Sequence, residues 1–329
     1  MTDTSIEWTD KTWNPVRGCT RVSEGCRNCY AEHMAGRFSG KGQAFEGFAK
    51  GGAHDYHGQS GRARTNGTWR WTGRVELIPS KLAEPLHWRT PRRIFVNSMS
   101  DLFHEALGFG AIAAVYGVMA AAKHHTFQVL TKRPERRQAF LKWIGSNPMG
   151  RLIWALAEQP VNYPKAIQLS PYQQWPLPNV WEGVSIEDQA TADKRIPLLA
   201  ETPAAKRFIS YEPALGPVDF SDGPSDPMST MGKWSMLDQI DWLIYGGESG
   251  PHARHNDLAW ARAARDACRA TPGPTAFFMK QLGAVPVGRG VVHPRRGRYV
   301  VIDGRWKKSA KGGNMDEWPV DLRVREFPT

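Results

Sequence analysis

A chain of 329 residues, of which 41% are hydrophobic and 23% charged, has the composition of a globular protein and not of a disordered or fibrous one. It contains no uninterrupted run of about 18 apolar residues, which excludes a transmembrane helix, and its first residues lack the pattern of a secretory signal. The 43 Lys and Arg against 32 Asp and Glu give a net charge of +11, which favours a polyanionic partner such as nucleic acid.

Short β-type runs alternate with amphipathic helical stretches along most of the chain. Strands are predicted in eight places: 13–18, 75–79, the first half of 92–103, 126–132, 179–186, 206–213, 241–250 and 275–283. Helices are predicted between them at 108–124, 134–144, 188–202 and 257–270. This alternation is typical of an α/β fold, and the strand number favours a complete or partial (β/α)8 TIM-type barrel. An open doubly wound sheet is the alternative.

Three segments interrupt the alternation. Residues 37–73 are rich in Gly and Arg and are predicted to form a long loop inserted in the barrel. Residues 145–178 hold a short helical stretch at 151–158, followed by a Pro-rich part. Residues 284–329 form a basic C-terminal extension with a predicted β-hairpin that turns at Asp303-Gly304. The barrel itself is therefore expected to span residues 1–283.

Polar residues stand where several of the predicted strands end. They are Ser98, Ser100, Asp101, Thr131, Lys132, Ser185, Tyr211, Glu212, Glu248 and Ser249. The carboxyl ends of the strands of a parallel barrel share one face, and active sites are built there, so we expect these side chains to meet. The pattern favours an enzyme over a pure binding module, which would not require it.

Three of the four cysteines, Cys19, Cys26 and Cys29, form a C-x6-C-x2-C loop near the N-terminus. In a chain without a secretory signal, clustered cysteines indicate metal or redox chemistry in a reducing cytoplasm. Three thiolates can hold a 4Fe–4S cluster and leave one iron open to another ligand, as a catalytic cluster requires. A structural zinc site that also uses His33 is equally compatible with the spacing. Cys268 lies in a predicted helix and is expected to be a core residue.

Four further motifs follow the cysteine loop in the order NSMSDLF (97–103), VLTKRPERR (129–137), GVSIEDQ (183–189) and YEPALGP (211–217). Together with the loop they resemble the radical S-adenosylmethionine superfamily, and in particular its spore-photoproduct-lyase-like branch. The segment WNPVRGCTRVSEGCRNCYAE (13–32), and with it nearly the whole chain, resembles a phage-encoded family of unknown function. The loop departs from the superfamily's usual form: six residues, not three, separate Cys19 from Cys26, and Asn28 replaces the usual aromatic residue.

The resemblance implies an enzyme and the residues of its site. The three cysteines would hold a 4Fe–4S cluster that binds and reduces S-adenosylmethionine, and the resulting 5′-deoxyadenosyl radical would abstract a hydrogen atom from the substrate. An external one-electron reductant is required. Lys132 would neutralise the methionyl carboxylate, and Ser185 would contact the ribose or the amino-acid part. The full set implied for this cofactor is Ser98, Ser100, Asp101, Lys132, Ser185, Glu212 and Glu248.

The long basic loop is the predicted nucleic-acid surface. Cations alternate there with aromatic side chains, an arrangement that neutralises phosphates and stacks bases. The residues assigned to this surface are Arg62, Arg64, Trp69, Arg70, Trp71 and Arg74. We expect the enzyme to modify a nucleobase or nucleotide in phage DNA. The alternatives are a zinc-stabilised nucleic-acid-binding protein without catalysis and a lyase that repairs DNA photoproducts.

Overall fold

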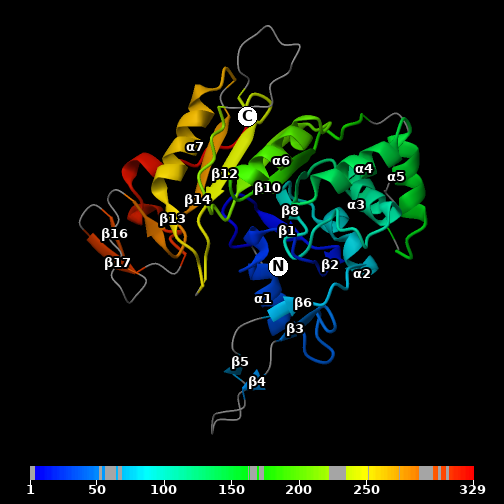
Figure 1. The fold of residues 1–329 in the computed structure, drawn as a ribbon. Helices are drawn as coiled ribbons and strands as arrows, with labels where there is room; N and C mark the ends of the chain where they lie inside the picture. Colours follow the sequence, from blue (N-terminus) through cyan, green and yellow to red (C-terminus); the bar gives the residue numbers. More distant parts are fainter. Residues whose placement is uncertain are drawn as a thin grey trace. The chain divides into compact units, whose positions relative to one another are not determined.

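The computed structural model describes most of the chain in two compact units (Figure 1). The described residues are 4–51, 54–55, 64–65, 69–161, 163, 169, 174–221, 235–250, 252–273, 275–288, 299–302, 305–308 and 311–329. For 54–55, 64–65, 299–302 and 305–308 only the backbone is described. The first unit comprises residues 1–5 and 9–180, and the second comprises 6–8 and 181–329. Each unit has its own hydrophobic core.

The first unit alternates short strands with helices. Its strands are β1 (Lys11–Trp13), β2 (Val16–Arg17), β3 (Ala49–Gly51), β4 (His54–Asp55), β5 (Arg64–Thr65), β6 (Trp69–Trp71), β7 (Glu76–Leu77), β8 (Arg93–Val96) and β9 (Thr126–Thr131). Its helices are α1 (Tyr30–Arg37), α2 (Pro79–Leu82), α3 (Phe109–Ala121), α4 (Pro134–Ile144) and α5 (Pro148–Ala157).

Three parallel strands form the centre of the first unit, in the order β1-β8-β9. Their buried side chains are largely aromatic or β-branched, which suits strands covered on both faces. Helix α3 consists almost entirely of small and apolar residues and is buried over most of its surface. Gly117 lets α5 lie directly beside α3 (Figure 1), because a Cβ atom there would lie 2.7 Å from Cγ of Leu156.

The strand predicted at 75–79 does not join these parallel strands. β7 covers only two residues and pairs antiparallel with β2, with Val16 opposite Leu77. The main parallel strands of the described residues therefore number seven, three in the first unit and four in the second. The predicted strand is present as the short β7, but the expectation that it joins the parallel strands is wrong, because its backbone pairs antiparallel with β2 instead.

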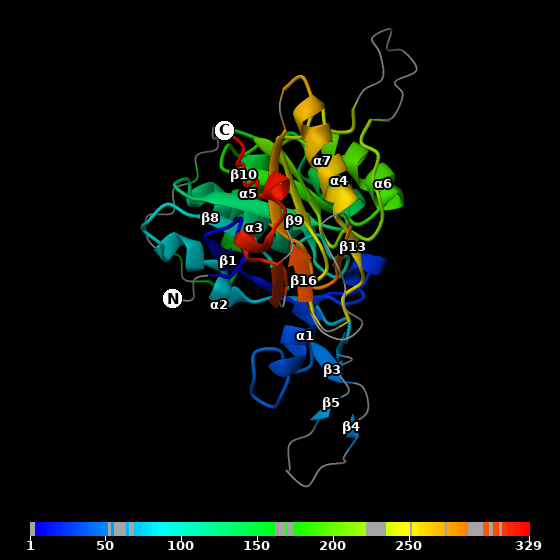
Figure 2. The same ribbon diagram turned by 90° about the vertical axis from the view of Figure 1, so that its left-hand side faces the viewer.

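Residues 37–73, predicted to be a long loop, contain short antiparallel strand pairs. β3 pairs with β6 and β4 pairs with β5. Helix α1 lies against β6 (Figure 1) and against β3 (Figure 2). The approach is close, since a Cβ atom at Gly36 would lie 2.0 Å from Cδ2 of Trp69. The loop prediction is therefore corrected for the described part of this segment, in which a tryptophan anchors a small sheet to a helix.

The second unit repeats the parallel pattern in the order β10-β11-β12-β14. Trp242 on β12 anchors its core, with ring centroids 6.0–6.1 Å from those of Trp8, Trp181 and Phe208. Helix α7 lies against β12 and β14. The elements are β10 (Val180–Ile186), α6 (Gln189–Ala200), β11 (Lys206–Tyr211), β12 (Trp242–Gly246), β13 (Asn256–Asp257), α7 (Leu258–Ala270), β14 (Ala276–Gln281), β15 (Pro286–Val287), β16 (Tyr299–Ile302) and β17 (Arg305–Lys308).

The hairpin predicted in the C-terminal extension is present as an antiparallel pair. Strand β16 pairs with β17, with Tyr299 opposite Lys308 and Ile302 opposite Arg305. The predicted turn at Asp303-Gly304 lies outside the described residues.

The prediction of an α/β fold with parallel strands and flanking helices is confirmed. Helix α4 begins and ends where the sequence indicates, because Pro134 suits the first helical position and Gly145 follows the last one with a positive φ of 58°. Among the described residues, no helix has both the length and the apolar character needed to cross a bilayer.

Candidate functional site

The three-cysteine loop lies between β2 and α1 and is held against the end of β8. Gly18, directly before Cys19, forms a parallel bridge with Ser100. Only glycine fits at this position, because its φ is 87° and a Cβ atom would lie 1.9 Å from the backbone oxygen of Arg74. Cys19, Cys26 and Cys29 are free thiols of intermediate exposure. The loop therefore presents its thiols beside the strand end and not on a distant surface.

The thiols influence one another electrostatically. Burial raises the pKa of Cys19 to about 12; Asp101 adds to this effect, Arg133 opposes it, and Cys29 and Cys26 add smaller increments. Burial also raises the pKa of Cys29, while the backbone N–H groups of Glu32 and Ala31 at the start of α1 oppose that rise. Without a metal these two thiols are protonated at neutral pH, and metal binding would have to release their protons.

Arg133 joins the cysteine loop to the strand ends. Its side chain is only 4% exposed. It donates to the backbone oxygen of Thr20 at 3.0 Å and to the Thr20 hydroxyl at 2.8 Å, and Nη1 lies 3.9 Å from Sγ of Cys19. The same guanidinium donates to Asp101 at 3.2 Å and to both oxygens of Glu105 at 3.0–3.1 Å. The sequence does not indicate this role of Arg133, although the residue stands in the TKRP motif next to Lys132.

Asp101 is the acceptor at the centre of this network. Its carboxylate accepts hydrogen bonds from the Thr131 hydroxyl at 2.7 Å and from the backbone N–H groups of Phe103 and Lys132, each at 3.0 Å. With the bond from Arg133 it has four donors and is almost completely buried. Asp101 thus fixes the turn after β9 to the turn after β8, and its own part in the site is to position neighbouring groups.

Thr20 and His104 extend the network. Nδ1 of His104 accepts from the backbone N–H of Ala106 at 3.1 Å, so the other ring nitrogen, 2.8 Å from the Thr20 hydroxyl, carries the proton and donates. Burial lowers the pKa of His104, and the charge of Arg133 lowers it further. His104 is therefore a neutral hydrogen-bonding partner at physiological pH, which the sequence analysis did not identify.

The other predicted residues of the first unit lie in the same region. The Ser98 hydroxyl donates to Asn14 Oδ1 at 3.2 Å, and the Ser100 hydroxyl donates to the backbone oxygen of Val16 at 3.0 Å. Lys132 follows β9 directly and is half-buried. The structure thus brings Ser98, Ser100, Asp101 and Lys132 together around the cysteine loop, as expected of strand ends on one edge.

Glu212, in the second unit, forms an ion pair that the sequence did not reveal. Lys280 donates to both of its oxygens, at 2.6 and 2.7 Å, with both side chains less than one fifth exposed. Gly246, on the strand between theirs, leaves the room for this pair, because a Cβ atom there would lie 3.1 Å from Cδ of Glu212. Ser185 lies beside them, and its hydroxyl donates to the backbone oxygen of Glu212 at 3.2 Å.

Glu248 is engaged in a different ion pair. The guanidinium of Arg254 donates to its two oxygens at 2.6 and 3.0 Å, and the backbone N–H of Arg254 donates at 2.8 Å. Gly247 cannot carry a side chain, since a Cβ atom would lie 2.4 Å from the backbone oxygen of Leu282. The GGE sequence at 246–248 therefore serves close packing and loop closure in this structure.

The predicted nucleic-acid residues fall into three groups. Arg62 lies outside the described residues, and only the backbone of Arg64 is described. Trp69 and Trp71 belong to β6 and are half-buried. The backbone N–H of Trp71 donates to the carboxylate of Glu32 on α1 at 2.8 Å. The two cations that remain at the surface are Arg70 and Arg74, with side chains 47% and 50% exposed.

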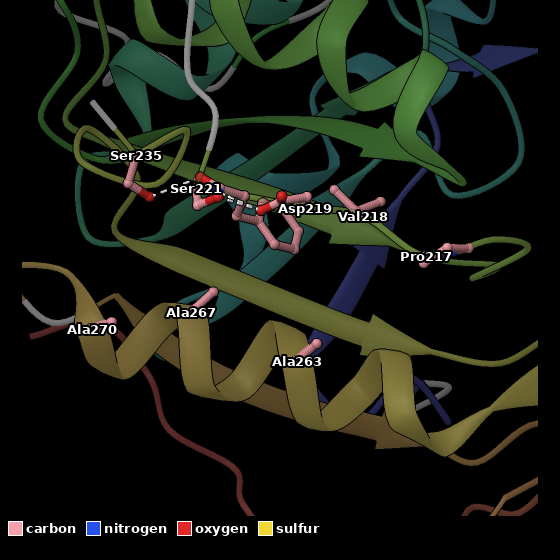
Figure 3. Close-up of a pocket in the computed structure, with 9 residues that line it drawn as sticks. Pro217, Val218, Asp219, Ser221, Ser235, Ala263, Ala267 and Ala270 are labelled. Atoms are coloured by element: carbon pink, nitrogen blue, oxygen red, sulfur yellow. Dashed lines mark hydrogen bonds between the residues drawn. The ribbon is translucent and has the colours of Figure 1, made fainter. Parts of the chain in front are cut away.

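A hollow occurs in the second unit, and the ring centroid of Tyr211 lies 6.3 Å from that of Phe220 in its lining. It has a volume of about 620 Å³ and lies between α7 and the segment that follows β11 (Figure 3). Its lining is largely apolar and consists of Pro217, Val218, Asp219, Phe220, Ser221, Ser235, Ala263, Ala267 and Ala270. Its single carboxylate, on Asp219, accepts from the hydroxyl and the backbone N–H of Ser221, so the hollow offers no paired acid and base.

The side chains that could bind a metal do not form a complete ligand set in the described part of the chain. No three Cys, His, Asp or Glu side chains there stand close enough to hold one ion. The donor set still suits a thiolate-bound metal group, because three thiols share one short loop and interact electrostatically. Binding would draw the loop together.

The chain belongs to a protein family described as "Protein of unknown function (DUF5131)", whose model matches residues 3–318. No curated protein and no solved structure matches it. The family of the chain is therefore established, and the family description names no activity.

The buried ion pair makes a direct prediction about stability. Arg133→Ala leaves the Asp101 carboxylate buried without its cation, and breaking a buried pair in this way costs about 3–5 kcal/mol. We expect the free energy of unfolding, measured by urea titration, to fall by that amount. Arg93→Ala is the control, because the Arg93–Asp10 pair is about one third exposed and should contribute at most about 1 kcal/mol. Equal losses in the two variants would contradict the central role of Arg133.

Proposed function

We propose that this protein is a radical S-adenosylmethionine enzyme that acts on a nucleobase or nucleotide. The observation that carries the proposal is the attachment of the cysteine loop, through Arg133 and Asp101, to the ends of two parallel strands. A peripheral structural zinc site has no need for such a buried link to the strand ends, where enzymes of α/β folds carry their chemistry. The arrangement therefore favours a catalytic metal group over a structural one.

Cys19, Cys26 and Cys29 would hold the 4Fe–4S cluster. When bound, this group would supply the single electron that cleaves S-adenosylmethionine and produces a 5′-deoxyadenosyl radical. Arg133 assists the ligands, because its charge beside Cys19 favours the thiolate that metal binding requires. Lys132 would bind the methionyl carboxylate, while Asp101 holds the Lys132 backbone in place. Ser98 and Ser100 would line the same edge.

The seven main parallel strands and their helices are consistent with a partial (β/α)8 barrel that is extended by a basic insertion and a basic C-terminal segment. In the second unit, Ser185, Glu212 and Glu248 are the proposed contacts to the cofactor. Glu212 and Glu248 already have cationic partners, so their contribution would be to orient polar groups and not to supply free charge.

Nucleic acid is the proposed source of the substrate. The net charge of +11 and the exposed side chains of Arg70 and Arg74 support an anionic partner. Arg70 lies between Trp69 and Trp71 on β6, and Arg74 follows three residues after that strand, so cations and aromatic side chains alternate along a stretch suited to a nucleotide chain. Resemblance to a phage-encoded family favours base modification over repair of photoproducts.

The metal group is tested first. Anaerobic preparation and reconstitution should give about four irons per chain and a brown colour. Replacing Cys19, Cys26 or Cys29 by Ala should abolish the iron and the colour. Cys268→Ala should retain both, because Cys268 lies on α7 and is completely buried in the hydrophobic core. Stoichiometric zinc without iron in an anaerobic preparation would instead establish the zinc-stabilised alternative.

Lys132→Ala tests the cofactor site. A hydrogen bond to a charged group contributes about 1.5–3 kcal/mol, so S-adenosylmethionine should bind at least about tenfold more weakly by calorimetry. Iron content should be unchanged. Lys142→Ala, which removes an exposed lysine from α4, is the matched control and should bind as the parent does. Undiminished binding in the Lys132 variant would remove this residue from the site.

The nucleic-acid surface is tested by salt dependence. For duplex DNA, the logarithm of the affinity should fall with the logarithm of salt concentration by about 0.9 per phosphate neutralised by the protein. Arg70→Ala with Arg74→Ala should make this slope shallower by about that amount for each phosphate that these arginines neutralise. Lys142→Ala with Arg151→Ala changes the net charge equally, but on helices α4 and α5, and should leave the slope unaltered. Identical slopes in all three proteins would place the nucleic acid elsewhere.

A further inference from the structure

Large apolar side chains are exposed in one place next to the cysteine loop. Seven large apolar side chains are substantially exposed among the described residues, and four of them lie between residues 22 and 38. They are Val22 at 43%, Tyr30 at 49%, Met34 at 37% and Phe38 at 46%. The last three are spaced four residues apart along α1 and its C-terminal end, so they form a stripe along one face. We call Tyr30, Met34 and Phe38 the α1 stripe.

The opposite face of α1 is fixed in the first unit, so the exposure of the stripe is imposed by packing. Ala31 and Ala35 are buried, and Gly36 lies directly against Trp69. The carboxylate of Glu32 is buried as well. It accepts from Arg21 at 3.1 Å and from the backbone N–H of Trp71 at 2.8 Å. Rotation of the helix to hide the stripe would bury polar residues and break these bonds.

The charge around the α1 stripe is positive. Arg27, Arg37 and Lys41 are exposed beside it, and neither Arg37 nor Lys41 has an ion-pair partner among the described residues. Three acidic side chains lie in this stretch and each is engaged: Glu24 lies 3.6 Å from Arg27, Glu32 is buried, and Glu46 accepts from the backbone N–H of Gly42 at 2.7 Å. The surface is thus an apolar stripe with a cationic rim.

We propose that the α1 stripe docks an acidic protein that delivers single electrons to the metal group held by the cysteines. Aromatic residues, Met and Arg are the types enriched at protein interfaces, and a cationic rim steers an acidic partner. The aliphatic member, Met34, cannot stack on bases as an aromatic ring does, which disfavours nucleic acid here. The stripe begins at Tyr30, the residue after Cys29, so a docked carrier lies close to the ligands.

This inference rests on the proposed function, which needs an external reductant. In the step it describes, the carrier loses one electron and the oxidised metal group gains one, with no bond made or broken. Tyr30 also donates a hydrogen bond to the backbone oxygen of Ser98 at 2.6 Å, which links the docking face to the end of β8. Met34 and Phe38 carry no such structural bond through their side chains and are the positions to vary.

The test compares two reductants on the anaerobically reconstituted protein. The probe is a small acidic flavoprotein, reduced to its hydroquinone, and the comparison reductant is dithionite, which needs no docking surface. Met34→Glu with Phe38→Glu should slow the bleaching of the metal group's visible absorbance by the flavoprotein about tenfold or more, which corresponds to the loss of a single interface hot spot. The rate of bleaching by dithionite should be unchanged. Arg37→Glu with Lys41→Glu should also slow the flavoprotein, most strongly at low salt.

The control variant places the same charges on the other exposed apolar pair of this unit. Ile153→Glu with Trp154→Glu on α5 should be reduced by the flavoprotein as fast as the parent. Equal slowing in both double variants, or none in the stripe variant, overturns the inference. Loss of DNA binding in the stripe variant with normal reduction by the flavoprotein also overturns it, because the stripe would then belong to the nucleic acid.

Direct binding separates this inference from the proposed function. Fluorescence anisotropy of the oxidised flavoprotein reports binding to the chain whether or not it contains metal. If the protein holds no iron but binds the flavoprotein through Met34 and Phe38, the proposed function fails and the docking surface stands. If iron is present and the stripe variant binds the flavoprotein as the parent does, the docking surface fails and the proposed function stands.

Discussion

The buried ion pair between Arg133 and Asp101 is the interaction on which the candidate site depends. Both side chains are less than 10% exposed, and each satisfies several further partners. A buried charge is tolerated only when its hydrogen-bonding groups have partners. Here one guanidinium and one carboxylate bond to each other, and together they also bond to two turns and to the cysteine loop. Three segments that are distant in sequence, around Thr20, Asp101 and Arg133, thereby occupy one place.

This network also sets the electrostatics of the thiols. Asp101 raises the pKa of Cys19 and Arg133 lowers it, so the two members of the pair act on the same sulfur in opposite directions. A thiolate bound to a cationic metal group would be stabilised beside Arg133 and destabilised beside Asp101. Nη1 of the guanidinium lies 3.9 Å from Sγ of Cys19 and so opposes the effect of Asp101 at short range. The same residue can therefore order the loop and modulate the metal group.

Acidic residues at the strand ends of the second unit are likewise paired with cations. Glu212 is paired with Lys280, and Glu248 with Arg254, in each case beside a glycine where a side chain would be in close contact with its neighbours. These carboxylates were singled out because acidic residues at strand ends are common in active sites. In the structure each is compensated by a cation, and such compensation can serve either a rigid scaffold or the orientation of a bound ligand.

The sequence by itself determined the α/β class, most of the main parallel strands, the helix that begins at Pro134 and the cysteine loop, because these follow from periodicity, helix-end residues and local spacing. It did not reveal α1 or the small sheet within residues 37–73, because α1 is eight residues long and the sheet's strands have only two or three residues each, too few to show periodicity. It assigned the strand at 75–79 to the parallel set, since the choice between a parallel neighbour and antiparallel pairing with β2 is made by backbone that is distant in sequence. It also missed Arg133, His104 and Lys280. Their roles arise only when turns far apart in sequence are packed together and buried charges must find partners, and that is decided by the tertiary structure.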